Sequence, residues 1–135
     1  MNELKHFPLN KKETMNIQNL IDKISKDPDI IGLIRYGSSV RNNKDYQDVD
    51  LCIVSKNKEI TAKKQLEYRL FLPEHYDVHF FHNLPLYIQH EVLKEGIVEY
   101  IKDYELLFDI YIQSIKADSL YRPRYLRYLE WIKNG

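Results

Sequence analysis

The sequence predicts an α/β (α+β) protein with a small mixed β-sheet flanked by helices. Short, apolar, β-branched runs alternate along the chain with longer stretches in which apolar residues recur at helical spacing. The chain has 135 residues, which is the size of one ordinary domain. Hydrophobic residues make up 44% and charged residues 30%, as in a globular protein with one core. We therefore expect a single domain over residues 1–135.

The first half of the chain predicts one helix followed by two strands. Residues 14–26 have helical periodicity, and Thr14 is placed to act as the N-cap. The apolar positions of this helix are Ile17, Leu20, Ile21 and Ile24. Residues 30–36, IIGLIRY, indicate a buried strand that ends at Gly37. Residues 48–55, DVDLCIVS, indicate a second strand because the apolar run is short and bounded by polar loops.

The middle of the chain continues the alternation. Residues 60–72 predict a helix, and residues 75–81, HYDVHFF, predict an aromatic-rich strand. Residues 84–95 predict a further helix that Gly96 closes as a C′ glycine. Residues 97–101, IVEYI, suit an edge strand. The order of the strands in the sheet stays open at this stage.

Two C-terminal helices are expected within residues 103–133. The first covers residues 103–117, and the second covers about 123–133 with Pro123 in its first turn. The stretch that contains it, residues 119–135, carries the aromatic and basic residues Tyr121, Tyr125, Tyr128, Trp131, Arg122, Arg124 and Arg127. We rank packing on the domain first for this helix, partner binding second and nucleic-acid binding third.

Composition disfavours several classes of protein. The formal net charge is zero, which argues against a strongly basic nucleic-acid binder. No apolar run is long enough to span a bilayer, and the N-terminus lacks the apolar core of a signal peptide, so a cytoplasmic protein is expected. The single cysteine, Cys52, excludes an intrachain disulfide and suits a small buried hydrophobic position.

Two aspartates at the start of the second strand require an explanation, because Asp is unfavourable inside strands. Side chains alternate faces along a strand, so Asp48 and Asp50 point the same way while Val49 and Leu51 point to the other face. Two carboxylates this close repel each other unless a cation lies between them. Mg²⁺ is such a cation, since it takes oxygen ligands and shares its remaining positions with water and phosphates. Two solvated carboxylates at a strand start are the alternative.

The turn before these aspartates has the features of a phosphate site. Glycine at position 37 lets the backbone approach a ligand closely. Ser38 and Ser39 supply hydroxyl donors, and Ser38 can cap a short helix whose N–H groups face an anion. Arg41 adds positive charge, unless it is an ordinary surface arginine. A phosphate-binding turn beside a metal-binding carboxylate pair suits phosphoryl or nucleotidyl transfer.

These residues carry a family resemblance. Gly37-Ser38, a spacer of nine residues and then Asp48-Val49-Asp50-Leu51 resemble the signature of the polymerase-β nucleotidyltransferase superfamily. The short chain is similar to the minimal nucleotidyltransferase (MNT) branch over roughly residues 15–115. The sequence departs from the commonest pattern at Asn42, where many relatives have Gly, and at Gln47, where many have Ser. Neither departure removes an expected ligand.

The resemblance implies a polymerase-β-like fold and assigns roles to individual residues. Asp48 and Asp50 would hold two Mg²⁺ ions that grip ATP or another nucleoside triphosphate. Asp77 would be the third carboxylate, as a metal ligand and general base; pairing with a nearby Lys or Arg is the alternative, with Asp45 and Glu74 as fallback ligands. The phosphates would lie on Gly37 and Ser38. Among the histidines His75, His79 and His82, which we expect in packing or surface roles, His79 shares the predicted face of Asp77.

The expected function is the transfer of a nucleoside monophosphate, most simply AMP from ATP, to an acceptor. A partner protein is a natural acceptor because the chain has little room for a separate acceptor domain. Many members of the MNT branch are antitoxins that inactivate a HEPN-domain toxin by binding or adenylylating it. One alternative is a catalytically weak or inactive partner-binding module in a homo- or hetero-oligomer. Another is an enzyme that adds nucleotides to RNA ends, which the neutral charge disfavours.

Overall fold

The computed structural model describes residues 9–41 and 48–117. Its elements follow one another in this order: α1 (Lys11–Ser25), β1 (Ile30–Tyr36), the 3₁₀ turn η2 (Gly37–Ser39), β2 (Val49–Ser55), α2 (Ala62–Arg69), β3 (Tyr76–Phe80), η3 (Phe81–Asn83), α3 (Leu86–Glu95) and β4 (Ile97–Ile101). Residues 104–117 form a further helix. The alternation of helices and strands predicted from the sequence is confirmed. The helix predicted for residues 123–133 lies outside the described residues.

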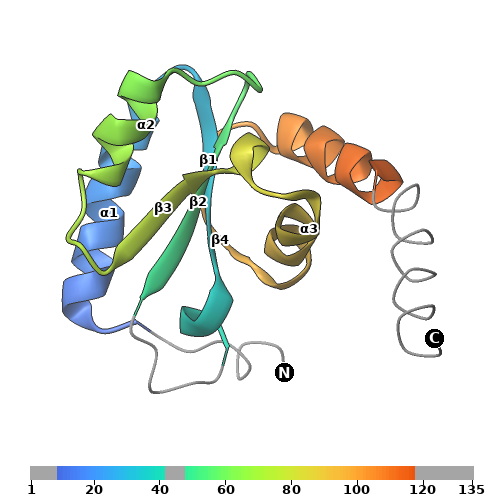
Figure 1. Cartoon of the computed structure of the whole chain (residues 1–135). Helices are drawn as coiled ribbons and strands as arrows, with labels where there is room; N and C mark the ends of the chain where they lie inside the picture. The colour runs from blue at the N-terminus through green and yellow to red at the C-terminus, as the bar shows by residue number, and fades with distance from the viewer. Residues whose placement is uncertain (1–8, 42–47, 118–135) are drawn as a thin grey trace, which may run out of the picture.

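The described elements form three layers, with the sheet in the middle (Figure 1). α1 and α2 cover one face, while α3 and the helix of residues 104–117 cover the other. The core on the α1 and α2 side includes Ile17, Leu20, Leu33, Val49, Leu51 and Tyr68. The core on the α3 side includes Ile34, Tyr36, Cys52, Val54, Val92 and Ile110. Both faces of the sheet are therefore buried, which explains the near-continuous apolar runs of β1 and β2.

The sheet has four strands in the order β3-β2-β1-β4. β1 runs antiparallel to both β2 and β4, whereas β2 and β3 run parallel. The sheet is thus mixed, and β4 lies at an edge, as the sequence predicted. A parallel pair needs a crossover connection, and α2 lies in the connection between β2 and β3.

The start of α1 differs from the prediction. The N-cap is Asn10, whose side-chain oxygen accepts a hydrogen bond of 2.9 Å from the backbone N–H of Glu13. Thr14 lies inside the first turn and donates its hydroxyl to the carbonyl of Asn10 at 2.9 Å. The prediction of Thr14 as the cap was wrong because apolar periodicity marks only the packed part of a helix, and the first turn of α1 carries charged residues.

Gly96 closes α3, but not as a left-handed C′ glycine. It is the C-cap residue with φ −69° and ψ 155°, which is extended backbone open to any residue. Glycine is required there because an added Cβ would overlap the carbonyl oxygen of Val92 and the Cγ2 of Ile34. The residue therefore serves close packing of α3 against β1 as the chain enters β4.

Two further predictions from the sequence concern the burial of Cys52 and the presence of a membrane-spanning helix. Cys52 is completely buried, as expected for a small hydrophobic residue, and burial raises the pKa of its thiol. Within residues 9–41 and 48–117, no helix combines the length and apolar character needed to cross a membrane.

Candidate active site

The site begins at the turn that follows β1. Gly37 has a φ of 77°, in the left-handed region that other residues rarely adopt. An added Cβ at this position would overlap Oδ2 of Asp50. The short turn η2 continues through Ser38 to Ser39 and is closed by a 3.1 Å hydrogen bond from the N–H of Val40 to the carbonyl of Gly37. The glycine turn therefore lies directly against a carboxylate of β2.

The three predicted carboxylates lie near one another at the start of β2 and β3. Asp50 of β2 and Asp77 of β3 are register partners on neighbouring parallel strands, so their side chains leave the same face side by side. Asp48 precedes β2 at the matching parity and is exposed. Val49 and Leu51 pack into the core on the α1 and α2 side, so the alternation predicted for this strand is confirmed.

Electrostatic repulsion is concentrated at Asp50. Burial, together with the charges of Asp77, Asp48 and Glu91, raises the pKa of the Asp50 carboxyl from 3.8 to about 6, while His79 acts in the opposite direction. Tyr36 is the register partner of Asp50 on β1, and its pKa is raised chiefly by burial and then by the charges of Cys52, Asp50, Asp77 and Glu91. A group of negative charges this close favours a bound cation.

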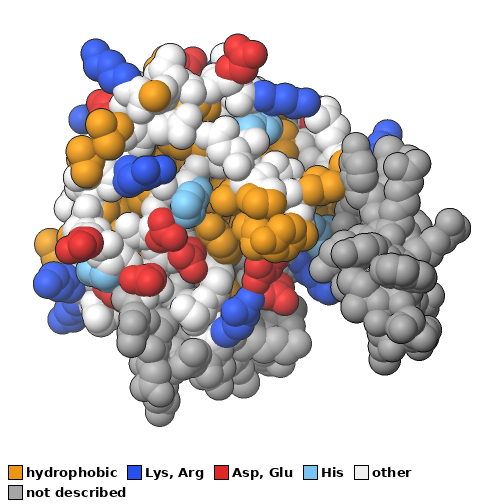
Figure 2. All heavy atoms as spheres, viewed as in Figure 1, with side chains coloured by type: hydrophobic (Ala, Val, Ile, Leu, Met, Phe, Trp, Pro, Cys, Tyr) orange, Lys and Arg blue, Asp and Glu red, His pale blue; other side chains and the backbone are white. Residues whose placement is uncertain are grey.

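Asp77 also has a histidine neighbour. The Nε2 of His79, two residues further along β3, lies 2.9 Å from Oδ1 of Asp77. This contact confirms that the two side chains share a face. Among residues 9–41 and 48–117, the ion-pair partner of Asp77 is this histidine and not a Lys or Arg. Figure 2 shows acidic side chains and a histidine together over β3, next to an apolar surface over α3. The candidate site is thus open on this face of the molecule.

The four residues predicted to bind phosphates occupy different environments. Gly37 and Ser38 are half-buried at the turn, whereas Ser39 is completely buried, and its hydroxyl has no hydrogen-bond partner among the described residues. Ser38 is therefore the hydroxyl placed to meet a ligand. Arg41 is exposed, and its guanidinium forms ion pairs with Glu91 and, at 3.5 Å, with Glu95 of α3.

The donor chemistry of the site fits Mg²⁺. Asp48, Asp50 and Asp77 offer only carboxylate oxygens, which Mg²⁺ prefers, and the raised pKa of Asp50 shows the repulsion that such an ion would relieve. In the part of the chain that the structure describes, no three His, Cys, Asp or Glu side chains already enclose a point where a metal could sit. Bound phosphates and water would complete the coordination.

Some residues near the site were not identified from the sequence. Glu91 reaches it only because α3 packs on this face of the sheet, which no sequence pattern shows. Arg35 is a charged residue inside an apolar strand, and that contrast is a sequence signal for a residue with a specific partner.

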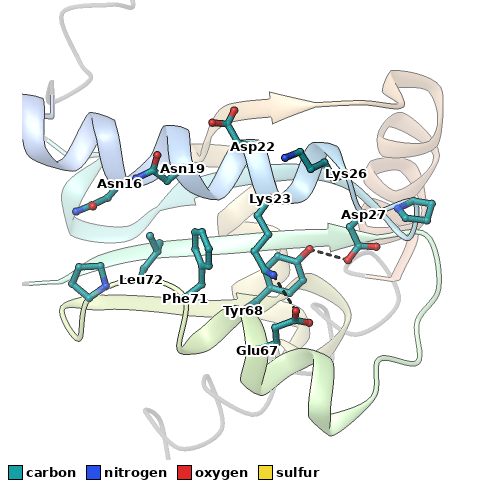
Figure 3. A pocket seen from close by; sticks show the side chains of 12 residues that line it. Asn16, Asn19, Asp22, Lys23, Lys26, Asp27, Glu67, Tyr68, Phe71 and Leu72 are labelled. Carbon is teal, nitrogen blue, oxygen red and sulfur yellow. Dashed lines mark hydrogen bonds and ion pairs between the residues drawn. The ribbon is translucent and has the colours of Figure 1, made fainter.

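Another cavity lies elsewhere, between α1 and α2 (Figure 3). Its volume is about 710 Å³. In this view Lys23 reaches from α1 toward α2, where its ammonium lies 3.0 Å from Glu67 and 5.1 Å from the centre of the Tyr68 ring. Tyr68 belongs to the core on the α1 and α2 side, whereas Asp50 and Asp77 leave the opposite face of the sheet. This cavity is therefore separate from the candidate active site.

Comparison with known proteins identifies the family. A family model described as polymerase beta, nucleotidyltransferase matches residues 18–105, which is more than half of the chain. The chain therefore belongs to the polymerase-β nucleotidyltransferase family, as its Gly-Ser and Asp-x-Asp motifs predicted. No curated protein sequence matches the chain.

Solved structures share the fold at low sequence identity. The chain is similar to a structure of the tri-AMPylated Shewanella oneidensis HEPN toxin in complex with MNT antitoxin, with a TM-score of 0.63 and 14% identity over 90% of this chain and 97% of that one. A mutant of the toxin–antitoxin complex MntA–HpeT gives a TM-score of 0.63 at 14% identity over 94% and 98% of the two chains. Another crystal structure from Shewanella oneidensis gives 0.68 at 10% identity over 93% and 99%. The predicted polymerase-β-like nucleotidyltransferase fold is confirmed.

Proposed function

We propose that this chain transfers a nucleoside monophosphate, most simply AMP from ATP, to a partner protein. The proposal is carried by one observation, the register pairing of Asp50 with Asp77 directly against the Gly37 turn. This arrangement places acidic groups that can bind a metal next to a glycine turn whose backbone can approach a ligand closely. Both are needed to hold a triphosphate and the charge that develops on it during transfer.

Each group has a separate role in the proposal. Asp48, Asp50 and Asp77 would hold the Mg²⁺ ions, two in the expected arrangement, and Gly37 and Ser38 would contact the β- and γ-phosphates. When bound, Mg²⁺ would polarise the α-phosphate and neutralise the pyrophosphate that leaves. Arg41 would add positive charge after exchanging its ion pair with Glu91 for a phosphate.

The proposed transfer is a single displacement at the α-phosphorus. A hydroxyl oxygen of the acceptor forms the new bond to phosphorus, and the bond from phosphorus to the oxygen that bridges to the β-phosphate breaks. Pyrophosphate leaves, and the hydroxyl proton passes to the carboxylate of Asp77. The ring of His79 lies 2.9 Å from this carboxylate and is placed to orient it.

A HEPN-domain protein is the proposed partner and acceptor. Support comes from the two similar structures that are complexes of toxins with antitoxins, in one of which the HEPN toxin is described as tri-AMPylated. By this analogy the chain would act as an antitoxin that modifies its toxin. The acceptor would then be a hydroxyl-bearing side chain of that protein.

A partner-binding module without catalysis is the second candidate. It is favoured by an apolar groove of about 190 Å³ between α3, β4 and the helix of residues 104–117. Tyr104 and Phe108 line this groove and remain 74% and 56% exposed. Large exposed apolar side chains in one area are typical of a protein-binding surface.

Transfer of AMP separates the two candidates. We expect that the purified chain, Mg²⁺ and ATP labelled at the α-phosphate will label a HEPN-domain protein offered as acceptor, with one pyrophosphate released for each AMP attached. Asp77→Asn should slow the transfer about 100-fold or more, yet still co-elute with the partner. The charge-matched control Asp22→Asn, on an exposed residue of α1, should keep full activity.

The other outcomes favour different functions. If the chain binds and neutralises the HEPN protein without label, it acts as a binding module. If label appears on an RNA oligonucleotide and not on protein, the chain modifies RNA ends.

A further inference from the structure

Arg35 is a buried charge that the proposed reaction does not use. It lies in β1 two residues before Gly37 and is only 5% exposed. A charged group in such a position is costly unless partners replace the water it has lost. Its partners therefore indicate what the residue does.

The guanidinium of Arg35 joins the edge strand to the glycine turn. Its Nε donates to Oε1 of Glu99 in β4 at 3.0 Å. Its Nη1 donates to the backbone carbonyl of Ser39 at 2.7 Å, and Ser39 is the last residue of η2. Both are charge-assisted hydrogen bonds, which are stronger than bonds between neutral groups.

Within the described part of the chain, the turn has few other hydrogen bonds that fix its shape. The N–H groups of Val40 and Arg41 share the carbonyl of Gly37 at 3.1 and 3.4 Å. The hydroxyl of Ser39 has no partner among the residues that the structure describes. The short bond from Arg35 therefore adds a side-chain anchor at Ser39, the last residue of the turn.

We propose that Arg35, oriented by Glu99, is a positioning residue that holds the Gly37–Ser39 turn in the shape that receives the triphosphate. The inference rests on the proposed function in so far as the turn binds phosphates. Arg35 would affect nucleotide binding through the backbone of the turn, because its guanidinium is buried and donates to the carbonyl of Ser39. The edge strand β4 thereby becomes part of the support of the site.

Arginine is suited to this task and lysine is not. The guanidinium carries several donors in a fixed planar arrangement, so it can bond Glu99 and Ser39 at once. An ammonium in the same place keeps the charge without that geometry. Arg35→Lys therefore removes the simultaneous bonds to Glu99 and Ser39 while it conserves the charge. Glu99→Gln keeps the shape of the Glu99 side chain while it removes the negative charge.

The test combines hydrogen exchange with nucleotide titration. In Arg35→Lys we expect faster amide exchange at Val40 and Arg41 and about tenfold weaker binding of Mg²⁺ with α,β-methylene-ATP. Affinity for Mg²⁺ alone should be unchanged. Glu99→Gln should show the same changes to a smaller degree. It provides a second variant if Arg35→Lys does not fold.

A matched control tests specificity. Glu67→Gln removes the charge of an ion pair of the same 3.0 Å length, which joins α2 to Lys23 of α1 away from the turn. It should leave the exchange of the turn and the nucleotide affinity unchanged.

Each remaining outcome has a distinct meaning. Unchanged exchange at the turn in both Arg35→Lys and Glu99→Gln would overturn the inference, as would equal effects of Glu67→Gln. If the wild-type chain binds no nucleotide but exchange at the turn increases in Arg35→Lys, Arg35 does hold the turn and the proposed function fails.

Discussion

Gly37→Ala is expected to abolish Mg²⁺-dependent nucleotide binding and to lower the free energy of unfolding by about 1–2 kcal/mol. The loss of stability follows from the φ of 77°, which places any side chain in a strained backbone conformation. The loss of binding follows from the contact with Asp50, because the new methyl group would overlap the Oδ2 of that carboxylate and displace it. One substitution would therefore disturb the phosphate turn and a metal ligand together.

Urea unfolding and calorimetric titration with Mg²⁺ and a non-hydrolysable ATP analogue measure the two effects. Ser38→Ala is the natural control, since it removes a hydroxyl without changing the backbone or touching Asp50. It should weaken nucleotide binding without abolishing it and should leave stability nearly unchanged. Wild-type nucleotide affinity in Gly37→Ala would mean that the turn does not take part in binding.

Asp50→Asn is expected to stabilise the protein at neutral pH while it removes metal binding. The folded state raises the pKa of this carboxyl from 3.8 to about 6, chiefly by burial and then by the neighbouring carboxylates. The folded state therefore binds the proton more tightly than the unfolded state. The resulting destabilisation is absent below about pH 4, grows between the two pKa values and is complete above about pH 6.

The sign of the effect follows directly. Near pH 7.5 the wild type carries the whole destabilisation, so Asp50→Asn should raise the free energy of unfolding by about 1–2 kcal/mol after allowance for solvent screening. Near pH 4 the two proteins should be equally stable. Excess Mg²⁺ should raise the melting temperature of the wild type near pH 7.5 but not that of Asp50→Asn, because only a protein that binds the ion in its folded state is stabilised.

Thermal melts at the two pH values, with and without Mg²⁺, test this prediction. Asp22→Asn makes the same chemical change at an exposed position on α1, and its melting temperature should follow the wild type at both pH values. A melting temperature of Asp50→Asn below that of the wild type near pH 7.5 would contradict the proposed repulsion.

Local sequence patterns were enough to predict most elements and the direction of the key side chains. Alternation along a strand fixes Asp48 and Asp50 on one face, and this needs no knowledge of neighbouring elements. The pairing of Asp50 with Asp77 is different, since it requires that β3 lie parallel beside β2. Strand order is set by packing between segments far apart in the chain, so the resemblance suggested this pairing and the structure shows it.

The parts that sequence reasoning missed depend on long-range contacts or on polar positions. The hydrogen bond from Arg35 to Glu99 requires that β4 lie next to β1, because only then does Glu99 come within reach of the guanidinium. Glu91 comes to the site through the packing of α3. The true cap of α1, Asn10, precedes the first apolar position, Ile17, by about two turns. It could have been found only from capping preference, as an Asn followed three residues later by Glu13.

The central claim is that the carboxylates of β2 form a metal–nucleotide site, and calorimetric titration tests it most directly. The wild type and Asp48→Asn/Asp50→Asn are titrated with a non-hydrolysable ATP analogue, with and without Mg²⁺. Asp22→Asn/Asp109→Asn serves as a control with the same change in net charge at exposed positions. We predict binding that requires Mg²⁺, persists in the control and is lost in Asp48→Asn/Asp50→Asn. Wild-type protein that fails to bind the analogue at millimolar concentration, or equal binding by all three proteins, would contradict the account.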